Sequence, residues 1–108
     1  MRKVLLGQVG VDSGQLMVSD PCYVKHFEDR DDGPQEFTKG DNGYSYTGAC
    51  STTLYEDDQG GELGNGMGVV FSSGFGDGAY DVHAYLDEID GWGERVVKVE
   101  ITLIGEEA

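Results

Sequence analysis

Basic side chains are scarce in this 108-residue chain, which has seven Lys and Arg against 21 Asp and Glu and a formal net charge of -14 at pH 7. Proteins that bind nucleic acid neutralise phosphates with Lys and Arg. We therefore expect no direct binding to nucleic acid or to an anionic membrane. A basic protein partner would instead be attracted at low salt. Plain solubility, or adaptation to salt, is the alternative explanation of the charge.

Long apolar runs and cysteine are scarce as well. No stretch approaches the ~20 apolar residues of a membrane-spanning helix. The N-terminal MRKVLLGQVGVDSG is interrupted by Gly7, Gln8 and Gly10, so it predicts a first strand and not a signal peptide. We expect a cytoplasmic protein, in which the two cysteines stay reduced. No motif predicts a cofactor.

Glycine and aromatic residues are abundant, with 18 Gly, six Tyr, four Phe and one Trp, which indicates a turn-rich β protein. Apolar and polar residues alternate with a period of two along several stretches. The predicted strands are residues 2–9, 14–19, 44–55, 66–73, 79–86 and 94–104. The first two and the last two strands are expected to form hairpins. Asp41-Asn42-Gly43 predicts a further hairpin, in which residues 37–39 pair with 44–46.

Helical patterns are almost absent, and a short helix is expected only near residues 24–30. The acidic segment Glu28–Asp32, followed by Gly33 and Pro34, predicts an exposed loop. Closing the strands on one another would remove exposed sheet edges. We therefore predict an all-β fold, a single domain over residues 1–108. It is expected to be a small antiparallel barrel or sandwich of six to seven strands with at most one short helix.

Three segments carry a resemblance to a known family: GQLMVSDPCYV at 14–24, YSYTGACS at 44–51, and VVFSSGFGDGAYDVHAYLD at 69–87. They are similar to a family of small bacterial and phage proteins that contain a domain of unknown function. The resemblance implies a compact β-rich domain and brings no activity with it. The acidic loop Glu28–Asp32 is not part of the family pattern.

Cysteine and histidine supply the candidates for metal binding and for covalent catalysis. Zinc sites bring such ligands in closely spaced pairs, and here only Cys22 and His26 are close in sequence. A nucleophilic Cys22 helped by a histidine is the enzymatic hypothesis, although nearby carboxylates raise the pKa of a thiol and weaken it. No catalytic residue is assigned. The weak metal candidates are Cys22, His26, Cys50 and His83.

The glycine-rich segment SSGFGDG is the candidate for ligand binding. Its amides, together with serine and tyrosine side chains, would line a small-molecule or nucleotide pocket at a barrel mouth. The Trp in the turn DGWG would indicate contact with a partner if it is exposed, and the alternative is that it folds back over a barrel end. The candidate ligand-binding residues are Tyr23, His26, Ser72, Ser73, Phe75, Asp77, Tyr80, His83 and Trp92.

Three functions are compatible with these patterns. The first is a non-enzymatic binding protein, an accessory or inhibitor-type protein of phage or bacterial origin that engages a basic protein. The second is a protein that sequesters a small molecule or nucleotide, and the third is a cysteine-dependent enzyme. Monomer and homodimer both remain open. Locally, Asp20-Pro21 is expected to end a strand, with Asp20 accepting backbone N–H groups and with Cys22 and Tyr23 packed inward.

Overall fold

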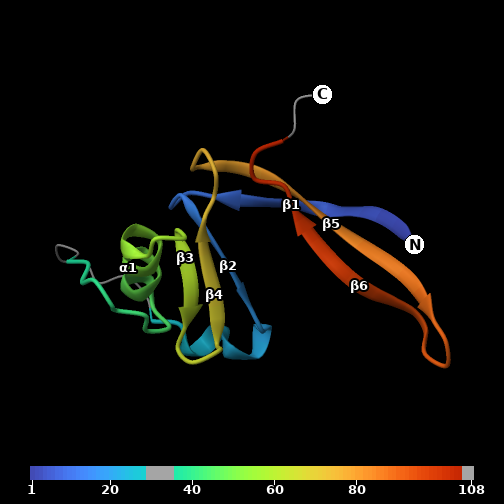
Figure 1. Cartoon of the computed structure of the whole chain (residues 1–108), viewed down its shortest axis with the longest axis horizontal. Coiled ribbons are helices and arrows are strands. Elements are labelled where there is room, and N and C mark those ends of the chain that lie inside the picture. The colour runs from blue at the N-terminus through green and yellow to red at the C-terminus, as the bar shows by residue number, and fades with distance from the viewer. Residues whose placement is uncertain (29–35, 106–108) are drawn as a thin grey trace. The chain divides into compact units, whose positions relative to one another are not determined.

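The computed structural model of the chain describes residues 1–28 and 36–105 (Figure 1). The chain divides into two compact units. Unit 1 comprises Met1–Gly14 and Gly74–Ala108, and unit 2 comprises Gln15–Ser73. The expectation of a single domain stays a prediction.

Unit 1 is a three-stranded antiparallel sheet. Its strands are β1 (Arg2–Val11), β5 (Gly78–Ile89) and β6 (Gly93–Ile101), and β5 lies between the other two (Figure 1). The tight turn at Asp90–Gly91 has glycine with a φ of 83°, a left-handed conformation that suits glycine because it lacks a Cβ. The predicted hairpin of the last two strands is therefore confirmed.

The two faces of this sheet differ in polarity, because side chains alternate along each strand. On one face, Val4, Ala84 and Val99 lie in register across the three strands, and Ala84 is fully buried. On the other face, Gln8 stands opposite Asp81, and His83 stands opposite Glu100. The period of two in the sequence thus places a polar row on one side of β5.

Unit 2 combines a second antiparallel sheet with a helix. The sheet has the order β2 (Gln15–Ser19), β4 (Gly68–Ser72) and β3 (Gly60–Leu63), and α1 (Tyr46–Tyr55) contacts β3 and β4 (Figure 1). A 3-10 helix, η1 (Pro21–His26), follows β2. The core cluster consists of Tyr44, Ala49, Leu63 and Val70, with Met17, Phe27 and Met67 packed against it.

The predicted strand over residues 44–55 is wrong, because most of this segment forms α1. The hydroxyl of Ser45 accepts a hydrogen bond from the Gly48 N–H at 2.9 Å, which satisfies one of the free donors at the helix start. Burial of Ala49 against β3 and β4 outweighs the strand preference of the neighbouring threonines. The predicted hairpin at Asp41-Asn42-Gly43 is absent for the same reason.

The strand pairing also differs from the expectation in the N-terminal half. Residues 2–9 and 14–19 were expected to form a hairpin, yet β1 pairs with β5 while β2 pairs with β4. Neither three-stranded sheet closes into a barrel. The all-β class and the count of six strands are confirmed in the described part of the chain. The acidic loop predicted after Glu28, together with Gly33-Pro34, lies almost wholly outside the described residues.

Both helical segments are short. Helix η1 covers part of the predicted 24–30 segment, and α1 was not expected as a helix. Within residues 1–28 and 36–105, no helix has the length and apolar character needed to cross a membrane.

Candidate functional site

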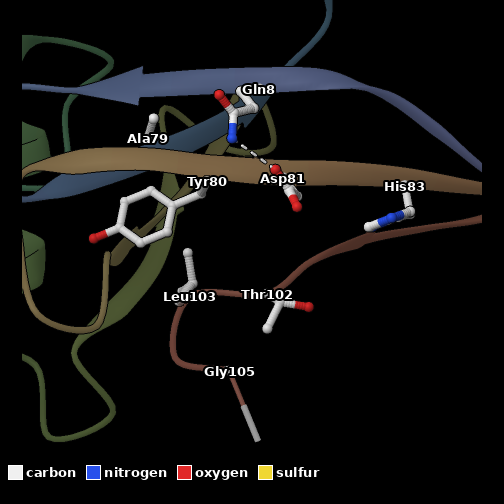
Figure 2. A pocket seen from close by; sticks show the side chains of 8 residues that line it. All are labelled: Gln8, Ala79, Tyr80, Asp81, His83, Thr102, Leu103 and Gly105. Atoms are coloured by element: carbon white, nitrogen blue, oxygen red, sulfur yellow. Dashed lines mark hydrogen bonds between the residues drawn. The ribbon is translucent and has the colours of Figure 1, made fainter.

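A pocket of about 510 Å³ opens on unit 1. Its volume falls within the range of roughly 300–1,000 Å³ that is typical of small-molecule sites. Strand β1 contributes one lining residue, β5 four, and the segment after β6 three (Figure 2). The lining residues are Gln8, Ala79, Tyr80, Asp81, His83, Thr102, Leu103 and Gly105.

Asp81 is the charged side chain of this pocket. Its Oδ1 accepts a hydrogen bond of 2.8 Å from the Gln8 amide across the β1–β5 register, and Figure 2 shows this amide directed at the carboxylate. Neither Lys nor Arg is among the lining residues. The carboxylate therefore meets a neutral donor inside the pocket and no cation.

His83 lies two residues beyond Asp81 on the same face of β5. Its Nδ1 is buried and finds no hydrogen-bond partner within the described part of the chain. A buried polar atom without a partner costs free energy, and such atoms are uncommon in native structures. The Nδ1 atom of His83 is thus a polar group that the described residues leave unsatisfied.

Tyr80 and Leu103 give the pocket apolar surface. The Tyr80 hydroxyl donates to the carbonyl of Gly76, which fixes the ring near the glycine-rich turn. The Thr102 side chain lies at the exposed edge of the pocket. The site therefore combines an apolar wall with a few polar groups, as ligand pockets commonly do.

A separate group of charges occupies the same polar face of the sheet. Lys3 and Lys98 lie 3.3 and 4.0 Å from the Glu100 carboxylate, and both ammonium groups lie over the Tyr85 ring. The hydrogen bond from Lys3 holds the pKa of Glu100 below its usual value. These two lysines are therefore engaged by their own neighbours.

Two of the nine predicted ligand-binding residues, Tyr80 and His83, line the pocket. Tyr23 and His26 lie on η1 in unit 2, and Ser72 and Ser73 lie at the end of β4. The serines were expected at a ligand pocket, but Ser73 is fully buried.

The remaining predicted residues lie in turns of unit 1. Phe75 and Trp92 are exposed, at 87% and 69% of their surface. Asp77 has a structural contact, because its Oδ1 accepts the Gly14 N–H at 2.9 Å. Phe75 and Trp92 stay candidates for contact with a partner.

Sequence reasoning missed Gln8, Asp81, Thr102 and Leu103. The alternation of side chains along residues 79–86 placed Asp81 and His83 on one face. This pattern was the signal in the sequence that could have pointed to Asp81 as a site residue. Gln8 became visible only with the β1–β5 pairing, a contact between segments more than 70 residues apart. The approach of residues 102–105 likewise depends on tertiary structure.

The cysteine and histidine candidates do not form a metal site in residues 1–28 and 36–105, where no group of three or more His, Cys, Asp or Glu can hold an ion. Cys22 and His26 lie on η1, Cys50 on α1 and His83 on β5. Both cysteines are free thiols. Cys22 and Tyr23 are exposed, so their predicted inward packing is wrong.

Asp20 is hydrogen-bonded to Cys22 and shifts the pKa of its thiol. Its Oδ1 accepts the Cys22 N–H at 2.9 Å, which confirms the predicted cap and lowers the pKa of Asp20. The carboxylate in turn raises the pKa of the Cys22 thiol, chiefly through a side-chain hydrogen bond. A raised pKa reduces the thiolate fraction, which is the opposite of what a cysteine nucleophile needs.

Comparison with protein-family models, with curated proteins and with solved structures finds no match to this chain.

Proposed function

We propose that the chain is a non-enzymatic binding protein that engages a basic protein through the acidic surface of unit 2. The observation that carries this proposal is the distribution of ion pairs. In the described part of the chain, every ion pair found lies in unit 1. The acidic residues of unit 2 in that part are Asp20, Glu28, Glu36, Asp41, Glu56, Asp57, Asp58 and Glu62. Their charges are available to an external cationic surface.

The run Glu56-Asp57-Asp58 is the strongest part of this surface. It is exposed and directly follows the C-terminal end of α1, where no basic side chain occupies the last turn. The C-terminal end of a helix carries a partial negative charge, so carboxylates there are unfavourable. A basic partner would relieve this repulsion as well as pair with the charges.

The proposal also covers the biological role of the protein and its location in the cell. It includes a cytoplasmic location and an accessory or inhibitor-type role in a phage or bacterium, as the resemblance to small phage and bacterial proteins implies. Electrostatic complementarity would mainly speed the encounter and select the partner.

An oligolysine peptide provides the test. We expect binding at about 0.1 M salt that is lost near 1 M, where the Debye length falls from roughly 10 to 3 Å. The variant E56Q/D57N/D58N should bind about tenfold more weakly. The control variant D12N/E88Q/D90N removes the same charge from exposed acids of unit 1 and should bind nearly as well as the parent.

Two outcomes would contradict the proposal. Absence of oligolysine binding at low salt would show that the surface does not attract cations. Equal weakening by both triple variants would show that attraction comes from net charge alone and not from unit 2.

The second candidate function is the binding of a small molecule, favoured by the unit 1 pocket. The pocket has a suitable volume, apolar surface and a histidine nitrogen with no hydrogen-bond partner among the described residues. A thermal upshift in a panel of metabolites would support it, because a ligand that binds only the folded state raises the unfolding temperature.

A further inference from the structure

The Asp81 carboxylate differs from most acidic side chains of its sheet. Asp87, Glu94 and Glu100 each have a cationic partner, supplied by the N-terminus, Arg2 and two lysines respectively. Asp81 has only the Gln8 amide, a neutral donor, as its partner in the described residues. A half-buried carboxylate without a counter-charge favours the approach of a cation.

The lining of the pocket excludes anions more readily than cations. No Lys or Arg lines it, and the lysines of the same face are held by Glu100 and Tyr85. A phosphate would meet the Asp81 charge without a compensating group. The nucleotide class is therefore disfavoured at this site, even though the pocket is large enough for part of such a ligand.

The apolar part of the pocket lining indicates which kind of cation would bind. Leu103 provides surface for a short hydrocarbon stem. A planar guanidinium suits the Asp81 carboxylate, because it can donate two parallel N–H bonds to it and is less strongly hydrated than an ammonium group. The open edge at Thr102 leaves room for the stem to extend outward.

We infer that the unit 1 pocket binds a guanidinium group on a short hydrocarbon stem, with Asp81 as its counter-ion and Leu103 against the stem. This inference rests on the second candidate function, ligand binding in the pocket, and is independent of the acidic surface of unit 2. The group is supplied either by a free small molecule or by an arginine side chain.

Butylguanidinium is the probe, titrated into the full ¹⁵N-labelled chain and followed by amide chemical shifts. We expect saturable shifts at Asp81, His83 and Thr102. Butylurea, of similar shape but uncharged, should bind at least about tenfold more weakly, because a hydrogen bond to a charged partner is considerably stronger than one to a neutral group. N-acetyl-arginine amide then separates the sources. If N-acetyl-arginine amide also binds, the site accepts arginine side chains. If only butylguanidinium binds, the site takes free cations.

Two variants test the role of Asp81. Asp81→Asn keeps an oxygen that accepts the Gln8 hydrogen bond and should weaken butylguanidinium about tenfold. Asp12→Asn removes the same charge from an exposed position elsewhere in unit 1 and should leave binding unchanged. Should D81N fail to fold, Thr102→Lys serves in its place. This residue is exposed, and the added cation should abolish binding.

Each contrary outcome has a distinct meaning. If butylurea binds equally, or if D81N and D12N weaken binding equally, the inference is overturned. If inorganic phosphate or ribose shifts the pocket amides while butylguanidinium does not, the inference is wrong but the second candidate function stands. If no probe binds, the inference is wrong, and the metabolite panel decides whether the second candidate function stands.

Discussion

At the scale of single residues, the contact of Asp20 with Cys22 links a local hydrogen bond to the pKa of a thiol. The carboxylate accepts the Cys22 N–H and raises the pKa of the thiol. This cap could be predicted from the sequence, because it joins residues two apart. The exposure of the Cys22 side chain could not be predicted, because burial depends on which residues from distant parts of the sequence pack against η1.

Asp20→Asn is expected to speed the alkylation of Cys22 at neutral pH. Removing the negative charge lowers the pKa of the thiol and increases the thiolate fraction, which is the reactive form. The measurement is the rate of iodoacetamide labelling at Cys22 by mass spectrometry, with Cys50 in the same sample as the internal control. Labelling of Cys22 that is equally slow in the variant would show that Asp20 does not govern the thiol.

At the scale of elements, α1 is the main failure of sequence reasoning. Its threonines and tyrosines fit a strand, and its hydrophobic residues lack a helical period. The helix depends on the Ser45 cap and on the burial of Ala49 and Leu63 in one cluster. By contrast, β5 and β6 were predictable because alternation and a short turn are local features.

Gly48→Ala is expected to destabilise unit 2 by about 1–3 kcal/mol, the usual range for overpacking. A Cβ at this position would lie 2.0 Å from the Gly43 carbonyl oxygen, which is backbone and cannot move aside. The higher helix propensity of alanine offsets only about 1 kcal/mol. The measurement is the opening free energy of α1 from amide exchange.

Gly10→Ala is the matched control, because nothing lies within 4 Å of a Cβ there and φ is not positive. It should change stability little. If G48A were equally neutral, the close approach of α1 to the Gly43 loop would be wrong.

The ion pair of Arg2 and Glu94 joins the two outer strands of the unit 1 sheet, with Nη2 and Oε1 2.7 Å apart. The hydrogen bond from Arg2 lowers the pKa of Glu94. The stabilisation is therefore fully present above the usual carboxyl pKa and is lost as pH falls through the lowered value. Between about pH 6 and pH 2, the protection factors of amides at the ends of β1 and β6 should fall more steeply in the parent than in Glu94→Gln. Parallel profiles would contradict this role of the pair.

At the scale of the whole molecule, charge is unevenly distributed between the units. Unit 2 has eleven acidic and three basic residues in its sequence, whereas unit 1 has ten and four. The excess of acidic residues was evident from composition, whereas the division of the acids in the described residues into those with and those without an ion pair was not. Ion pairs such as Lys3–Glu100 depend on strand register, and so does the position of Asp81 beside Gln8. The sequence therefore predicts the attraction to cations, while the structure distinguishes, among residues 1–28 and 36–105, the acids with an ion pair from those without one.

Salt should accordingly act on the two units differently. Between about 0.01 and 1 M NaCl the Debye length falls from roughly 30 to 3 Å. Screening then reduces repulsion among the acids of unit 2 that have no ion pair within the described residues, so amide protection of α1 and β4 should increase. In unit 1 the same salt also weakens the pairs of Arg2 with Glu94 and of Lys3 with Glu100, so protection should rise less or fall.

Hydrogen exchange resolved by unit measures both effects in one sample. Sucrose, which favours compact states without screening charge, is the control and should protect both units alike. An equal gain in both units under salt would show that ion pairing in unit 1 does not compensate its acids, and the electrostatic contrast on which the proposed function rests would be lost.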